Sequence, residues 1–275
     1  MTENQIKKIR RAVVSGSGII CAVFLLIILC SRRGGVESKY IASAHSPDIR
    51  KTLQQAVETN DYIKIGYLAG KNVNINQLLD NGKSALITAA GKGYRETVEV
   101  LLKNNADTEK CDLAGNTALA VAAANGDIEL IQMLLLYKAD INSGSGNGKT
   151  ALLAAVRNGQ RNAVEFLLKN NAPLWPGRAS GRSATVSALQ HKHIEIARLL
   201  LENGDDVYAA DAAGNSVLML AAKQGSAELV KYILEKYPVD LSQGNSAGET
   251  VFSIAIQSGN DRLIKLVKQY VSQPE

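Results

Sequence analysis

A glycine recurs at nearly constant intervals through most of this 275-residue chain. The intervals are 33, 33, 33, 33 and 34 residues, and the glycines are Gly82, Gly115, Gly148, Gly181, Gly214 and Gly248. A period in this range is typical of proteins built from stacked repeats, so it constrains the fold more than any other property of the sequence. One such unit cannot bury its apolar side alone, and we expect neighbouring units to share one continuous, elongated core.

Each repeated glycine is followed by two apolar runs of helical length. The first run begins with Ser or Thr, as in SALITAA (84–90), and the second is exemplified by TVEVLL (97–102). Ser or Thr at this place can cap the free amide groups of a helix. Glycines that can adopt positive φ separate the runs: Gly93, Gly126, Gly159, Gly225 and Gly259. Lys192 takes that place in the fifth unit, and the pattern predicts a helix, a tight turn and a second helix in every unit.

These features resemble the ankyrin repeat family, over roughly the whole chain after residue 47. The matching features are the glycine and Thr/Ser spacing, Ala-Ala in the first helix, Leu-Leu in the second, and the closing segments NNAD (104–107), YKAD (137–140) and NGDDV (203–207). The family's Thr-Pro-Leu-His pattern has Ala or Val in place of Pro here, and no unit keeps the His. The resemblance implies an all-α ankyrin-repeat solenoid of about seven helix-turn-helix units that binds another protein.

We divide the chain into an N-terminal signal-anchor or transmembrane segment with basic flanks (1–33), a linker (34–47) and an ankyrin repeat domain (48–275). The expected units of the repeat domain are 48–78, 79–111, 112–144, 145–177, 178–210, 211–244 and 245–275. The first unit lacks the opening glycine and carries more polar residues, as a terminal capping unit requires.

The formal charge of +5 arises entirely in residues 1–33, which contain six Lys or Arg and one Glu. The rest of the chain is formally neutral and does not interleave aromatic with basic residues. We therefore expect no nucleic-acid partner.

Residues 12–30 are uncharged and strongly apolar from Ile19 onward. About 20 apolar residues are needed to span a bilayer as a helix, so this segment is long enough to be an uncleaved transmembrane anchor. A lipoprotein lipidated at Cys30 is the second interpretation, and Leu29 before it is a poor match to the small residue that processing prefers. A cleaved signal peptide is the third, because its apolar region is usually shorter.

The basic flanks predict the orientation of this segment. Four Lys or Arg precede it and two, Arg32 and Arg33, follow it. Positively charged flanks tend to stay in the cytoplasm, so we expect a single-pass protein of the bacterial inner membrane with periplasmic repeats. An outer-membrane lipoprotein is the second choice, and Arg32 and Arg33 leave a cytoplasm-facing repeat domain open.

No arrangement of residues indicates catalysis. His191 and His193 lack the Cys or carboxylate partners of a metal site, and we expect them to diverge into solvent. Cys111 is interpreted as a small buried residue, and residues 144–149 lack the spacing of a phosphate-binding loop. We expect no catalytic, cofactor-binding or metal-binding residue, no enzyme activity and no small-molecule substrate.

The resemblance implies that binding uses the turn before each first helix and the exposed side of that helix. The residues that map to this surface are Lys83, Lys92, Asn116, Asn125, Lys149, Arg157, Arg182, His191, Asn215 and Lys223. Glu249 also maps to this surface and is its single acid, whereas Glu96, Glu99, Glu129, Glu165 and Glu195 fall in the second helices. A basic concave face that attracts an acidic protein is one hypothesis, and a polar face that serves solubility is the other.

The sequence thus favours a membrane-tethered, periplasm-facing module that binds a protein stoichiometrically and masks or assists an acidic enzyme. Small exported ankyrin proteins of similar layout include immunity or accessory proteins for secreted toxins such as phospholipases, which gives an alternative. A membrane-attached adaptor scaffold facing the cytoplasm is another.

Overall fold

A computed structural model describes residues 49–144, 149–174 and 183–272, which form fourteen helices in seven consecutive pairs. The pairs are α4 (Ile49–Glu58) with α5 (Tyr62–Gly70), α6 (Ala85–Lys92) with α7 (Arg95–Lys103), α8 (Ala118–Asn125) with α9 (Ile128–Leu136), α10 (Ala151–Arg157) with α11 (Arg161–Lys169), α12 (Ala184–Gln190) with α13 (Ile194–Glu202), α14 (Val217–Lys223) with α15 (Ala227–Lys236), and α16 (Val251–Gln257) with α17 (Asp261–Val271). Each expected unit contains one pair, and the described residues form no strand beyond two isolated bridges.

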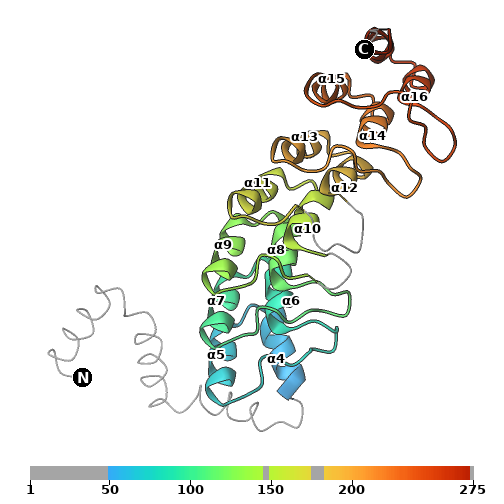
Figure 1. The fold of residues 1–275 in the computed structure, drawn as a ribbon. Helices are drawn as coiled ribbons and strands as arrows, with labels where there is room; N and C mark the ends of the chain where they lie inside the picture. The colour runs from blue at the N-terminus through green and yellow to red at the C-terminus, as the bar shows by residue number, and fades with distance from the viewer. Residues whose placement is uncertain (1–48, 145–148, 175–182, 273–275) are drawn as a thin grey trace, which may run out of the picture.

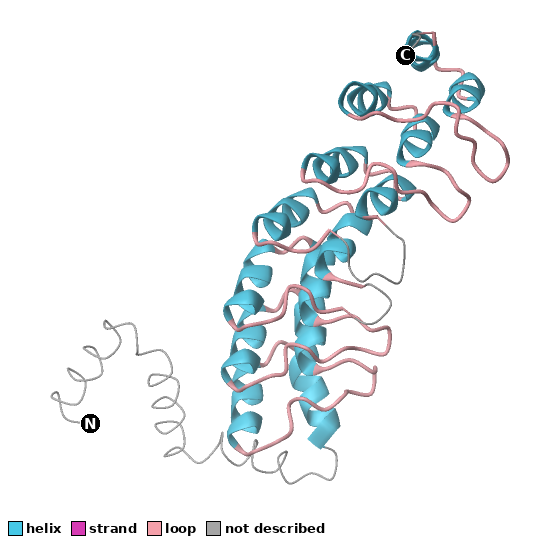
Figure 2. Cartoon of the chain, viewed as in Figure 1, coloured by secondary structure: helices cyan, strands magenta, loops and turns pink. Residues whose placement is uncertain are grey.

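The helices stand in two rows (Figure 1). The even-numbered helices, α4 to α16, form an inner row, and the odd-numbered helices form an outer row beside it. The long loops that connect one unit to the next project beyond the inner row, as Figure 2 shows in pink. This arrangement confirms the solenoid that the repeat predicts.

Local sequence sets the helix boundaries. The hydroxyl group of Ser84 accepts a hydrogen bond from the Ile87 amide at 3.2 Å, and Thr117 and Thr150 cap α8 and α10 in the same way. Gly93 ends α6 with φ of 70°, a left-handed conformation that costs glycine little. Lys192 adopts φ of 65° at the corresponding place in the fifth unit, as its position in the repeat predicts.

The core runs continuously between the two rows. Small residues of the inner helices, such as Ala89 and Ala122, are completely buried because each helix is covered by the units on both sides. Leu101 and Leu134 of the outer helices fill the space between the rows. Apolar burial of this kind is the main contribution to folding, and here it depends on stacking of the units.

One carboxylate interrupts this apolar core, in the fifth unit. Asp205 is 4% exposed and stands where the earlier units have Ala106, Ala139 and Ala172. Its Oδ2 accepts hydrogen bonds from the Ser183 hydroxyl at 2.8 Å and from the amide and hydroxyl of Thr185, both at 2.7 Å. Thr185 in turn stands where the other units have Leu or Phe, so the two polar replacements face each other.

The described ranges contain no helix that is long and apolar enough to cross a membrane. The expected membrane segment at residues 12–30, its alternative lipidation site Cys30 and the linker at 34–47 all lie outside these ranges.

Candidate binding surface on the inner helices

The exposed sides of the inner helices and the loops before them form one surface, which we call the inner face. The array curves toward this side (Figure 1). Lys83, in the loop before α6, and Asn125, at the end of α8, are both exposed on it. The acids Glu96, Glu99, Glu129, Glu165 and Glu195 lie on α7, α9, α11 and α13, as the sequence predicts. These five acids therefore lie on the outer row and not on the inner face.

A pocket of about 310 Å³ opens on the inner face between units three and four. Its lining consists of Asn116, Ala120, Val121, Ala124, Lys149, Ala154, Arg157 and Asn158. Three of the residues predicted for binding, Asn116, Lys149 and Arg157, therefore come together around one hollow. The lining combines two cations and two amides with four small apolar side chains, and it contains no acid.

Small side chains create this pocket. Ala120 stands where other units carry Ile87, Leu153, Val186 and Met219, and Ala124 stands where later units carry Arg157, Gln190, Lys223 and Gln257. The alanines leave space beneath the longer side chains of Lys149 and Arg157. This floor was not predicted from the sequence, although the missing bulk at residues 120 and 124 is visible once the units are aligned.

The polar side chains at the rim of the pocket differ in the hydrogen bonds that they already make within the protein. The ammonium group of Lys149 donates a hydrogen bond to the carbonyl of Ala114, so it joins unit four to the loop of unit three. The amide of Asn116 donates to both carboxylate oxygens of Asp112, at 3.2 and 3.1 Å. Within the described ranges, the side chain of Arg157 makes no hydrogen bond or ion pair.

Asp112 is the acidic group joined to the pocket through Asn116. Partial burial acts to raise the pKa of its carboxyl group, but hydrogen bonds from Asn116 and from the amide of Ala114, together with the charge of Lys83, bring the pKa below its ordinary value. The carboxylate is therefore ionised at neutral pH, and it accepts its hydrogen bonds from Ala114 and Asn116 of its own loop.

The remaining predicted residues are spread along the array. Lys92 donates to the carbonyl of Glu58 at 3.4 Å and lies over the ring of Tyr94, and Asn125 donates to the carbonyl of Gly91 at 3.3 Å. Arg182 lies outside the described residues. Neither Lys92 nor Asn125 lines the pocket.

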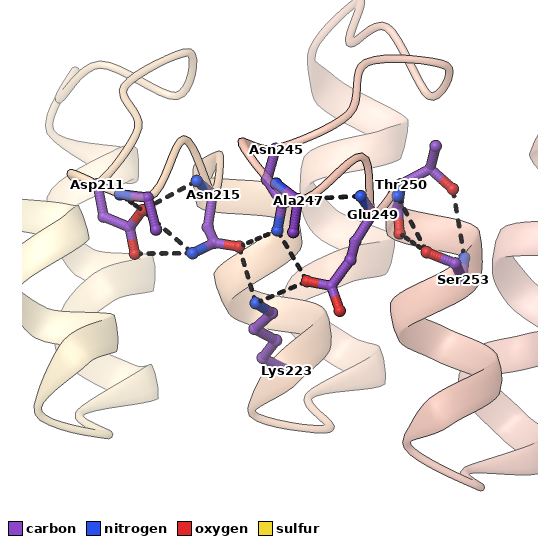
Figure 3. Close-up of polar contacts among 9 residues, drawn as sticks. Asp211, Asn215, Lys223, Asn245, Ala247, Glu249, Thr250 and Ser253 are labelled. Atoms are coloured by element: carbon purple, nitrogen blue, oxygen red, sulfur yellow. Dashed lines mark hydrogen bonds and ion pairs between the residues drawn. The ribbon is translucent and has the colours of Figure 1, made fainter.

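Asn215, which the repeat phase also placed on the binding surface, is buried between units six and seven. Its side chain is 6% exposed, because the amide donates to Asp211 and its oxygen accepts from Lys223 and from Asn245, both at 2.8 Å. Lys223 also pairs with Glu249 at 3.3 Å (Figure 3). Both predicted residues thus connect units six and seven to each other, and Asn215 presents almost no surface to a partner.

The two histidines do not diverge as predicted, although His191 is exposed to solvent as expected. Their rings stack with centroids 6.4 Å apart and planes 14° from parallel. His191 Nδ1 lies 2.8 Å from the carbonyl of Ser187, while His193 is half-buried with Nε2 at 3.2 Å from the carbonyl of Arg157. His193 therefore joins unit five to the end of α10.

Metal and thiol chemistry receive no support from the described part of the chain. No group of three or more His, Cys, Asp or Glu side chains gathers there in a way that could hold a metal ion. Cys111 is half-buried, and burial together with the charges of Asp112, Glu109 and Asp107 raises the pKa of its thiol. A raised pKa reduces the fraction of nucleophilic thiolate at neutral pH.

Stacked helix pairs with projecting loops and a preformed inner face define a helical repeat protein of the interaction-scaffold class. Profiles described as "Ankyrin repeats (3 copies)" match residues 53–145 and 121–211, and one described as "Ankyrin repeats (many copies)" matches residues 200–255. The chain belongs to the ankyrin repeat family, whose members are protein–protein interaction modules and typically not catalytic.

Solved structures show the same fold. The ankyrin repeat domain of human ASB11 is 22% identical with a TM-score of 0.66, and the match covers 84% of this chain and all of that one. The ankyrin repeat domain of Bcl-3, a member of the IkappaB family, is 23% identical with a TM-score of 0.66, and the match covers 78% of this chain and 97% of that one. A search among curated proteins gave no match. At these identities the likeness establishes the fold alone.

Proposed function

We propose that the protein binds an acidic protein partner stoichiometrically, with the middle of the inner face as the contact region. The observation that carries this proposal is the pocket between units three and four, where Lys149 and Arg157 meet and neither forms an ion pair within the described ranges. Cations that have no internal counter-ion attract an acidic surface and speed its encounter with the inner face.

The mechanism is capture on a preformed surface. The inner helices are held by burial on both sides, so a partner does not have to order them when it binds. Low ordering cost leaves more of the contact free energy available as affinity. The inner face covers part of the partner's surface, and this contact masks or assists the partner. The ankyrin protein carries out no chemical step.

The proposed location is the periplasmic side of a bacterial inner membrane, with residues 12–30 as the anchor. Support comes from the apolar length of this segment and from its more basic N-terminal flank. A reporter that is active only outside the cytoplasm, fused after Glu275, tests the orientation, and a C30A version separates a lipoprotein from an anchor. Activity in both versions is the expected result, and inactivity of a stably expressed fusion would place the repeats in the cytoplasm.

Two narrower roles fit the same binding mode. In the first, the partner is a secreted toxin such as a phospholipase, for which the protein acts as an immunity or accessory protein. Support for this role is the combination of an export-type segment with a repeat array. In the second, the repeats face the cytoplasm as an adaptor scaffold, which Arg32 and Arg33 after the apolar segment favour.

Site-specific photo-crosslinking tests the contact region in living cells. A photoreactive phenylalanine derivative at Asn125 reports on the inner face, and the same residue at Gln132 reports on the outer row; both positions are exposed and lie in unit three. We expect one discrete crosslinked protein from Asn125 and none from Gln132. Equal crosslinking from the two positions would contradict an inner-face contact.

A further inference from the structure

We infer that the pocket between units three and four binds a single carboxylate side chain from an acidic segment of the protein partner, with the Arg157 guanidinium as its anchor. This inference rests on the proposed function and specifies the chemistry of its central contact. It depends on three features of the structure: a cation left without a counter-ion, an internal example of the same contact, and an apolar floor of suitable size.

Arg157 is the rim group with free hydrogen-bonding capacity. Its side chain is half-buried at the end of α10 and makes no hydrogen bond or ion pair within the described ranges. Residues 145–148 and 175–182, which are outside those ranges and flank the helix pair of unit four in the sequence, include no Asp or Glu. An Arg guanidinium binds a carboxylate through two parallel hydrogen bonds, and partial removal from water strengthens such a pair.

Unit six contains the same type of contact within the protein itself. Lys223 occupies the repeat position that corresponds to Arg157, and its ammonium group lies 3.3 Å from the carboxylate of Glu249 in the next loop (Figure 3). In the loop that follows unit four, the position corresponding to Glu249 is Arg182, which cannot supply a carboxylate. Lys223 thus shows that a cation at this repeat position can pair with an acid on the inner face. An acid that pairs with Arg157 in the same way would come from a partner.

The size and lining of the pocket suit one side chain. A volume of about 310 Å³ has room for a Glu side chain together with part of a neighbouring residue. Ala120, Ala124 and Ala154 offer an apolar floor for the methylene groups of a Glu residue and for an adjacent aliphatic side chain. Lys149 lies on the rim with its ammonium group held by the carbonyl of Ala114, and it adds a second positive charge.

The test uses the full-length ¹⁵N-labelled protein and three defined probes followed by NMR. The probes are the peptide acetyl-Ser-Leu-Glu-Leu-Ser-amide, its analogue with Gln in place of Glu, and sodium acetate. We expect the Glu peptide to shift the Arg157 Nε–H signal and the amide signals of Ala120 and Ala124 in a saturable manner. The Gln peptide and acetate should bind at least about tenfold more weakly, because each lacks either the charge or the apolar flanks.

Variants identify the anchor. Gln replaces Arg at the corresponding positions of units five and seven, as Gln190 and Gln257, so R157Q is compatible with the fold. We expect R157Q to weaken Glu-peptide binding by about tenfold or more, while R161Q, an equal change of charge on the outer helix of the same unit, leaves it unchanged within about twofold. A124Q fills the pocket without changing the charge, and it should weaken binding to the same extent as R157Q.

Three results would overturn the inference. They are unchanged affinity in R157Q, equal affinity for the Gln peptide, and equal affinity for acetate, which would reveal a general anion site. Crosslinking from Asn125 distinguishes this failure from failure of the proposed function. If R157Q crosslinks the same partner as the unmodified protein, the inner face binds a protein without this anchor.

Discussion

The buried carboxylate of unit five provides the most informative single perturbation of the array. Asp205 and Thr185 replace an Ala and a Leu that are buried in the core in units two, three and four. We predict that D205A and T185L each destabilise the protein, whereas the double variant T185L/D205A restores the packing of those units and is close to the unmodified protein in stability.

The magnitude follows from the contacts that each change removes. D205A deletes the acceptor of four hydrogen bonds. Three reach Oδ2, from the Ser183 hydroxyl and from the amide and hydroxyl of Thr185, which is itself completely buried, and the fourth reaches Oδ1 from the part-buried Asp206 amide. Buried donors without an acceptor cost about 1–3 kcal/mol each, and the Ser183 hydroxyl, 3.1 Å from the Thr185 amide, can still accept from that amide. We therefore expect a loss of about 3 kcal/mol for D205A.

T185L removes one donor from a buried carboxylate and places an apolar chain against it, which should cost about 2 kcal/mol. The double variant removes the carboxylate and the hydroxyl together, and replacing both partners by apolar groups is often nearly neutral. A double variant within about 1 kcal/mol of the unmodified protein corresponds to a coupling free energy of about 4 kcal/mol, favourable to the double change.

Urea unfolding followed by circular dichroism measures the free energy of unfolding of the four proteins. Hydrogen exchange of the backbone amide at position 185, followed in each of the four, reports on unit five alone. The reasoning is refuted if D205A costs less than about 1 kcal/mol, or if the effects of the two single changes simply add in the double variant.

Three further outcomes are expected. K192G should raise the urea midpoint and stabilise the protein by about 1 kcal/mol, because Lys192 has φ of 65° where most other units have glycine. A lower midpoint would show that contacts of the Lys192 side chain stabilise the fold by more than its backbone conformation costs. G126A should destabilise the protein by about 1–2 kcal/mol in the same assay, because Gly126 has φ of 73° and the added Cβ would lie 2.4 Å from Gln160 Oε1. The control G70A should leave the stability unchanged, because no atom lies within 4 Å of the new Cβ. Acid should weaken the fold through Asp112 and Asp211. Burial raises the pKa of each carboxyl group, but hydrogen bonds outweigh burial and leave both pKa values below the ordinary value of about 3.9. The stability that these carboxylates contribute is therefore complete well above about pH 3.9 and is lost as the pH falls through and below that value. D112N/D211N should therefore show a flatter unfolding profile below pH 4, and an unchanged profile would assign acid sensitivity to other groups.

The repeat pattern was sufficient to predict the fold because each unit carries its own local instructions. Ser84 and its equivalents start the inner helices, and Gly93 or a tolerated substitute such as Lys192 supplies the positive φ of the turn that follows them. These signals act within a few residues, and the same apolar positions recur in every unit. A pattern that is both local and periodic leaves little for long-range contacts to decide about the type of fold.

The binding surface could be predicted only in outline. Repeat phase placed Asn116, Lys149 and Arg157 on one surface, and the structure brings them around one pocket. The same phase also selected Asn215, which is buried because Asn245 of the next unit and Lys223 both reach it. Phase gives the face of a helix on which a residue lies, but it does not say whether a neighbouring unit covers that residue.

The sequence by itself therefore determined the repeat, the helix pairs and their caps, since these depend on local backbone preference and on periodicity. Only the tertiary structure decided which cations are free and where the surface is hollow. Lys223 is paired with Glu249 whereas Arg157 has no pair among the described residues, although both occupy the same repeat position. The physical reason is that charge pairing and cavities depend on contacts between adjacent units, and these change whenever one neighbour carries Ala120 or Arg182 in place of a larger or acidic residue.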